Sequence, residues 1–109
     1  MRACRVVLRP RARAEMDAAA AWYAEQGGLA LEQRFVDALS VAFTHISRHP
    51  ASGNSVQGMS LGVDTLRFWP VKKFPYLIFY LQHDENVDVW RVLHAERDIP
   101  ASLRAGVTG

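Results

Sequence analysis

The chain has 109 residues, of which 50% are hydrophobic, and a formal net charge of +2 at pH 7. This length suits a single domain over residues 1–109 with its own core, and the composition excludes a disordered protein. No apolar run approaches the about 20 residues of a membrane helix, and no secretory signal follows the amino-terminal arginines, so we expect a cytoplasmic protein without a membrane segment.

The first half of the chain predicts one strand followed by two helices. Cys4–Leu8 is β-branched in its middle and stopped by Pro10, which favours a short strand. Strong helix formers over Arg11–Gln26 predict a first helix, which the two glycines at 27 and 28 end. Apolar residues then recur at helical spacing from Leu31 to about His49. Because so few residues separate the helices, we expect an αα-hairpin.

The second half predicts a β-meander. Ala51–Val63 is rich in Ser, Gly and Asn without a period and is predicted to be a loop. Strands are expected at Thr65–Trp69, at Tyr76–Leu81 and at Val87–Leu93. The middle strand is apolar on both faces, which favours a central position. The pattern β-α-α-β-β-β predicts an α+β fold, with the helical hairpin packed on one face of a mostly antiparallel sheet.

A polar cluster, His94-Ala95-Glu96-Arg97-Asp98, follows the last predicted strand. The aromatic strand, the last strand and this cluster resemble the ParE branch of the ParE/RelE toxin superfamily, which includes plasmid stabilisation proteins. The similarity covers nearly the whole chain from Val6 to Leu103. Further matching positions are Asp17, Trp22-Tyr23, Phe35, Pro50 with Gly53, and Arg67.

This resemblance implies the toxin component of a type II toxin–antitoxin system. Such a toxin inhibits DNA gyrase, and so replication, as an inhibitor protein and not as an enzyme. It is neutralised by a cognate, ParD-like antitoxin whose disordered, often acidic tail folds over it. The resemblance implies no cofactor, and we expect no direct binding to nucleic acid.

Two alternatives stay open. A ribosome-dependent mRNA endonuclease of the RelE type would use His94, Arg97 and Arg67 for proton transfer and for charge stabilisation on phosphorus. Against this, Leu77 stands where the RNase members place an arginine, and no tyrosine follows Tyr80. The second alternative is a non-toxic binding module or decayed toxin.

The candidate binding residues fall into two groups. We expect the end of the last strand to contribute to the target surface, and the helical hairpin with the neighbouring sheet edge to receive the antitoxin. For the polar cluster a purely architectural role is the alternative, with Arg97 and Asp98 paired or capping a helix. The expected target-binding residues are Arg91, His94 and Arg97, and the expected antitoxin-binding residues are Trp22, Tyr23, Leu31 and Phe35.

The sequence gives weaker indications of metal-binding and anion-binding sites. His45 and His49 are spaced as two metal ligands on one helix face, but no third ligand lies beside them, so we expect no metal site. Cys4 is the only cysteine, which excludes an internal disulfide bond. The arginines crowded between Arg2 and Arg13 suit either an acidic partner or ordinary solvated flanks of a strand and a helix.

Overall fold

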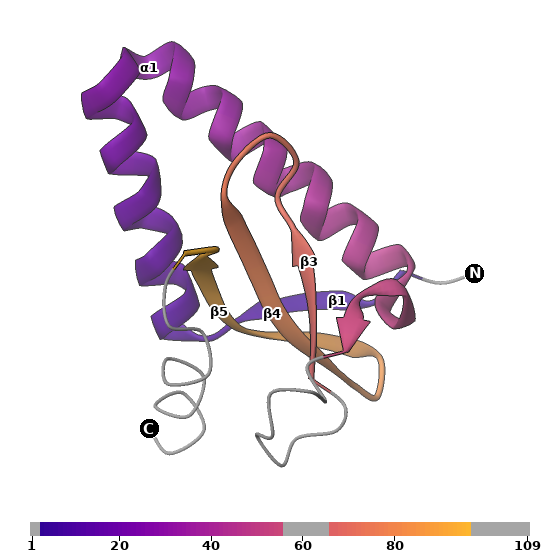
Figure 1. The fold of residues 1–109 in the computed structure, drawn as a ribbon. Coiled ribbons are helices and arrows are strands. Elements are labelled where there is room, and N and C mark those ends of the chain that lie inside the picture. The colour runs from indigo at the N-terminus through magenta and orange to yellow at the C-terminus, as the bar shows by residue number, and fades with distance from the viewer. Residues whose placement is uncertain (1–2, 56–65, 97–109) are drawn as a thin grey trace.

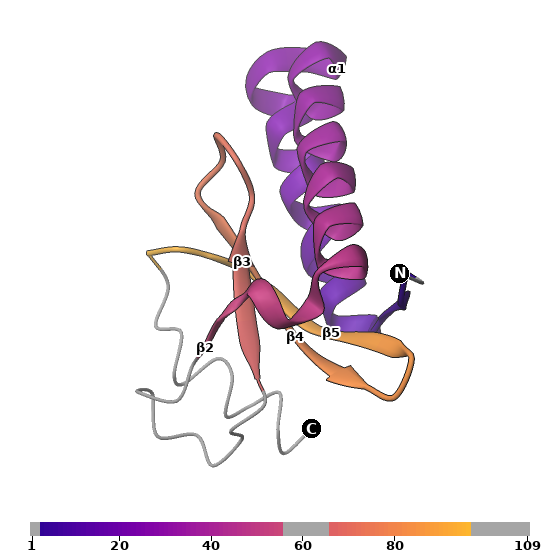
Figure 2. The ribbon, with the colours of Figure 1, turned by 90° about the vertical axis from the view of Figure 1, so that its right-hand side faces the viewer.

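The structure is a computed structural model that describes residues 3–55 and 66–96. Within these ranges the chain forms two layers, a long bent helix on one face of a five-stranded mixed sheet (Figures 1 and 2). The strand order is β1-β5-β4-β3-β2, in which β1 pairs with β5 in parallel and the other pairs are antiparallel. The elements are β1 (Arg5–Leu8), α1 (Pro10–Arg48), the 3₁₀ turn η1 (Pro50–Ser52), β2 (Asn54–Ser55), β3 (Arg67–Pro70), β4 (Tyr76–His83) and β5 (Asn86–His94).

The α+β class is confirmed, whereas the expected hairpin of two separate helices is wrong. Helical structure runs as one element from Pro10 to Arg48, with a sharp bend at Gly28, and the two arms descend from this bend in Figure 1. Gly28 has φ 75° and ψ −171°, a conformation open almost only to glycine. The change of direction therefore takes a single residue, and no loop separates the arms.

Alanine at position 28 is expected to destabilise the protein by about 1–3 kcal/mol, because a Cβ is strained in this backbone conformation. The strain is conformational, since a Cβ built on Gly28 would meet no atom within 4 Å. Denaturant unfolding of Gly28→Ala measures the loss. The matched control Gln26→Ala lies on the exposed surface of the same arm and is expected to change stability by less than about 0.5 kcal/mol. An equally stable Gly28→Ala would show that the bend does not depend on glycine.

The sheet has an apolar cluster on each face. The larger one packs α1 against the sheet and includes Phe35, Ile46, Ile78 and Tyr80. The smaller one consists of Leu66, Phe79, Trp90 and Leu93, all at most 8% exposed. β4 supplies both clusters and lies in the middle of the strand order, so the central position predicted for Tyr76–Leu81 is confirmed.

A bulge in β5 changes which face its residues take. Tyr80 on β4 pairs with Val89 and Phe79 pairs with Arg91, so the register shifts between them. Trp90 thus has no partner on β4, and a bulge of this kind redirects the side chains that follow. β2 and the last two residues of η1 fall in the segment Ala51–Val63, which is predicted from the sequence to be a loop.

Tyr80 connects β4 to the turn that follows α1. Its side chain is fully buried, and its hydroxyl donates a 2.8 Å hydrogen bond to the carbonyl oxygen of Pro50. A Cβ at Gly53 would overlap the same hydroxyl, so glycine is required there by close approach. Burial raises the pKa of the Tyr80 phenol, an effect that a hydrogen bond with the Gly53 backbone and the charge of Arg67 partly oppose.

Tyr80→Phe is expected to cost about 1 kcal/mol at neutral pH, because the Pro50 carbonyl loses its donor. The cost should shrink as pH rises above about 10. In that range Tyr80 releases its proton more readily in the unfolded chain than in the folded protein, so the free energy of unfolding of the wild type falls. Phenylalanine has no such proton, and the variant therefore keeps its stability in this range. Unfolding free energies of both proteins at pH 7 and between pH 9 and 11 test this. A gap that widens with pH would contradict it.

Candidate functional site

Glu15 on α1 and Arg91 on β5 form an ion pair at the end of the sheet. The Arg91 Nε lies 3.0 and 2.9 Å from the two carboxylate oxygens, and its terminal nitrogen lies 2.5 Å from one of them. Glu15 also accepts the backbone N–H of Val92 at 3.0 Å. β1 pairs with β5 only as far as Val89. Beyond that residue, the Glu15 carboxylate binds the edge of β5 in place of a neighbouring strand.

This pair gives a structural role to one residue of the expected target surface. Arg91 was expected on the target-binding surface, but the residue is only 4% exposed and its guanidinium is bound by Glu15. The bulge in β5 and the approach of α1 enclose the side chain. Arg91 therefore joins the helix to the sheet.

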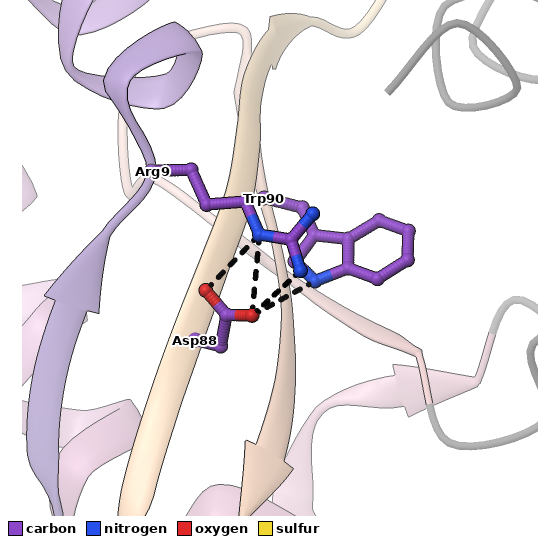
Figure 3. Close-up of polar contacts among 3 residues, drawn as sticks. All are labelled: Arg9, Asp88 and Trp90. Carbon is purple, nitrogen blue, oxygen red and sulfur yellow. Dashed lines mark hydrogen bonds and ion pairs between the residues drawn. The ribbon is translucent and has the colours of Figure 1, made fainter. Parts of the chain in front are cut away.

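A second ion pair fixes the junction between β1 and α1 (Figure 3). Arg9, the residue before the helix, donates from Nε and from a terminal nitrogen to Asp88 on β5, the shortest distance being 2.9 Å. Its guanidinium also lies over the ring of Trp90, 4.4 Å from the centroid, and the Trp90 indole N–H donates to the same carboxylate at 3.2 Å. The side chain of Arg9 thus has a structural role, whereas Arg11 and Arg13 lie exposed.

His94 ends β5 and is half-buried beside Tyr76 on β4. The two rings lie edge to face with centroids 5.2 Å apart. The Nδ1 atom accepts the backbone N–H of Glu96 at 3.2 Å, which places the proton of the neutral ring on Nε2. Of the expected target-binding residues, His94 is accessible at this end of the sheet, whereas Arg97 and Asp98 lie outside the described residues.

The two candidate nuclease residues that the structure describes, Arg67 and His94, are not brought together. Arg67 pairs in register with Tyr80, and His94 pairs with Tyr76, so the two lie four residues apart along β4, which is about 13 Å. The Arg67 guanidinium donates to the carbonyl oxygen of Gly53 at 2.8 Å. Proton transfer and phosphate stabilisation by these two residues at one reacting centre would need them within a few ångströms of it.

The expected antitoxin-binding residues divide between core and surface. Phe35 is fully buried and Tyr23 is 7% exposed, and their rings lie 4.9 Å apart between α1 and the sheet. Leu31 is half-buried against the same cluster. Trp22 is 52% exposed. Phe35 therefore fills the core of this structure, and Trp22 is the most exposed member of the set.

An apolar groove runs between the second arm of α1 and β3, with a volume of about 550 Å³. Val41 in its wall is 66% exposed, and the lining residues Lys72 and Lys73 in the β3–β4 turn are also exposed. The sequence analysis missed this groove, although Val36 and Val41 lie off the core-facing stripe of the helix, which is the signal that could have indicated it. The lining residues are Ala38, Val41, Ala42, His45, Trp69, Pro70, Lys72 and Lys73.

His45 belongs to the groove wall. Its ring stacks on Trp69 with centroids 4.0 Å apart and planes at 17°, and its Nε2 lies 2.8 Å from the Ser52 hydroxyl. The His49 ring lies 5.3 Å from that of His45. Among residues 3–55 and 66–96, no three His, Cys, Asp or Glu side chains gather as a metal ion would require, and no helix there is long and apolar enough to cross a membrane.

The fold and the groove define a small α+β protein with one helical layer on a mixed sheet and an accessible apolar helix surface. The family model described as "ParE toxin of type II toxin-antitoxin system, parDE" matches residues 6–99. The chain belongs to this family of ParE toxins, which confirms the resemblance seen in the sequence.

Structural comparison agrees with this at the level of the fold. A solved chain of the chromosomal ParDE TA system from P. aeruginosa superposes with a TM-score of 0.71 at 14% sequence identity. The similarity covers 85% of this chain and 97% of the other. No curated protein sequence matches the chain.

Proposed function

We propose that this toxin inhibits DNA gyrase, and so replication, and that a cognate ParD-like antitoxin neutralises it. The match of the ParE family model over residues 6–99 carries the proposal, because it covers the whole of α1 and every described strand except the first residue of β1. The distance between Arg67 and His94 supports an inhibitor over a nuclease, since the two are not placed at one reacting centre. Leu77, in place of an arginine, supports the same choice.

The antitoxin would bind across the exposed side of α1 and the groove beside it. Apolar side chains there, among them Val36 and Val41, would pack against an amphipathic segment. Lys72 and Lys73, which line the groove, would attract acidic residues of an antitoxin tail. The target surface would include His94 at the end of β5 and Arg97, which follows three residues later in the sequence.

Reversing the two lysine charges is expected to weaken antitoxin binding about tenfold, mainly through slower association at low salt. The double variant Lys72→Glu, Lys73→Glu and the wild type are compared by surface plasmon resonance at two salt concentrations. The double variant Lys72→Arg, Lys73→Arg keeps both positive charges, is the control and should bind as the wild type does. Equal affinity of the double variant would remove the lysines from the antitoxin site.

Induction of the protein alone in cells tests the function. Growth arrest with a DNA damage response and intact transcripts is the expected result, and co-expression of the antitoxin should restore growth. Arrest with cleaved messenger RNA would replace gyrase inhibition by ribosome-dependent nuclease activity. Normal growth despite accumulation of folded protein would favour a non-toxic binding module.

A further inference from the structure

Lys73 adopts a backbone conformation that lysine rarely takes. Its φ is 70°, and within residues 3–55 and 66–96 the other non-glycine residue with a positive φ is Asp84, at 55°. Aspartate and asparagine tolerate this left-handed region because their short polar side chains can hydrogen-bond to the local backbone, an advantage that a long lysine side chain does not have. The presence of lysine at position 73 is therefore not explained by the backbone conformation.

The core on both sides of the β3–β4 turn holds Lys73 in this conformation. The Phe74 N–H donates to the Val71 carbonyl oxygen at 3.2 Å, so Lys73 is the third residue of a four-residue turn. Val71 is 2% exposed, and the Phe74 ring lies 5.0 Å from that of Tyr23. A turn with a positive φ at its third residue ordinarily has glycine or asparagine there. Either residue would thus fit this turn with less strain than lysine does.

The described part of the protein gives the Lys73 side chain no internal role. No ion pair or hydrogen bond joins its ammonium group to another residue within the ranges 3–55 and 66–96. The residue is exposed and lines the apolar groove between the second arm of α1 and β3. Residues in strained conformations cluster at binding sites, where the position of the side chain is needed for contact with a ligand. The backbone of Lys73 therefore points to a use of its side chain in the groove.

The charges of the groove indicate the chemistry of this ligand. The formally charged side chains that line it in the described part of the chain are those of Lys72 and Lys73, and no aspartate or glutamate is among the lining residues. Most of the other lining residues are apolar, among them Val41 and Trp69. A lysine ammonium group is a compact charge with three donors, so a carboxylate is its complementary partner. An acidic residue with apolar neighbours thus suits the groove.

We propose that Lys73 binds a carboxylate of the antitoxin directly, in a segment that places apolar side chains along the groove. This inference rests on the proposed function and refines it, because it assigns different roles to the two lysines. Lys72, the second residue of the turn, is not among the residues with a positive φ, so the backbone does not restrict which residue stands there. Its charge contributes at longer range, and the direct contact belongs to Lys73.

Substitution by asparagine tests the strain at position 73. Lys73→Asn is expected to raise the midpoint of thermal unfolding by about 2–5 °C, because asparagine tolerates the left-handed conformation better than lysine does. Lys72→Asn changes the charge by the same amount at the neighbouring exposed position and should shift the midpoint by less than about 2 °C. An unchanged or lower midpoint of Lys73→Asn would show that lysine is not strained in this turn and would overturn the inference.

A small carboxylate tests the groove of the toxin alone. Phenylbutyrate is titrated into ¹⁵N-labelled protein, and the indole N–H signal of Trp69, which lines the groove, is followed by NMR. Phenylbutyramide has a similar shape without the charge and is the matched probe. We expect a saturable shift, with binding of the amide at least about threefold weaker, a preference that Lys73→Asn loses and Lys72→Asn keeps. No response at Trp69, equal binding of both probes, or a preference that survives in Lys73→Asn would overturn Lys73 as the carboxylate site.

The antitoxin complex tests the occupant. At high salt, where long-range attraction is screened, Lys73→Asn is expected to dissociate from the antitoxin about threefold faster than the wild type, because a direct contact is lost. Lys72→Asn should keep the dissociation rate of the wild type and associate more slowly at low salt. Equal dissociation rates of Lys73→Asn and the wild type would overturn the direct contact, while the proposed function would stand. A wild-type toxin that binds no antitoxin would overturn the proposed function together with this occupant, and the probe titration would still decide the carboxylate site.

Discussion

Glu15→Ala is expected to destabilise the protein by about 3–5 kcal/mol, the cost of leaving one member of a buried ion pair without its partner. The Arg91 side chain is 5% exposed and would keep its charge inside the structure. The backbone N–H of Val92 would lose its acceptor as well. Unfolding in urea with circular dichroism detection measures the loss of free energy.

Glu25→Ala is the matched control, since it removes an exposed carboxylate from the same arm of α1 and should change stability by less than about 0.5 kcal/mol. The double variant Glu15→Leu, Arg91→Met replaces the pair by apolar side chains of similar size. It should recover much of the lost stability, because no buried charge remains. If Glu15→Ala unfolds at the same urea concentration as the wild type, the pair does not hold α1 to β5.

Phe35→Ala is expected to cost about 3–5 kcal/mol, because it opens a large cavity between α1 and the sheet. The side chain is fully buried, and its ring lies 4.9 Å from Tyr23 and 5.2 Å from Phe74. Such a loss approaches the whole stability of many small domains. Thermal and urea unfolding measure it.

Val36→Ala is the control for this position, because the next residue of the helix lies at the surface, 42% exposed, and loses little on truncation. Antitoxin binding by the Phe35→Ala protein, measured beside its stability, separates the two roles considered for Phe35. A Phe35→Ala protein as stable as the wild type, but with weakened antitoxin binding, would return the residue to a binding surface.

The strand pattern was the most predictable part of the fold. Residues 76–81 are apolar on both faces, and the structure places them at the centre of the sheet as β4. The short strands and turns were harder to predict. η1 and β2 lie in a segment without periodicity, where hydrogen bonds such as that from Tyr80 to Pro50 decide the path of the chain.

The bend of α1 shows that a pair of glycines does not by itself predict how two helical segments are connected. Two consecutive glycines predicted a break and a loop, and the helix instead resumes directly after Gly28. One residue with a positive φ suffices to redirect a helix, and the sequence does not say whether a loop follows.

The candidate site was predicted only in part, because its contacts join distant parts of the chain. Glu15 and Arg91 are 76 positions apart, and no local pattern pairs them. Trp22 and Tyr23 are neighbours on a helix, where adjacent side chains point in different directions, and of the two only Trp22 is largely exposed. Phe35 lies on the apolar, core-facing stripe of its helical segment. This periodicity indicated its buried position, whereas its match to the toxin family did not.

Inhibition of DNA gyrase by the purified protein tests the central claim most directly. Relaxed plasmid, gyrase and ATP are incubated with increasing amounts of toxin, and supercoiled product is separated by gel electrophoresis. Supercoiling should fall as the toxin approaches and exceeds the concentration of gyrase, and the antitoxin added at an equal amount should restore it. Supercoiling that is unchanged at a stoichiometric excess of folded toxin would contradict the proposed function.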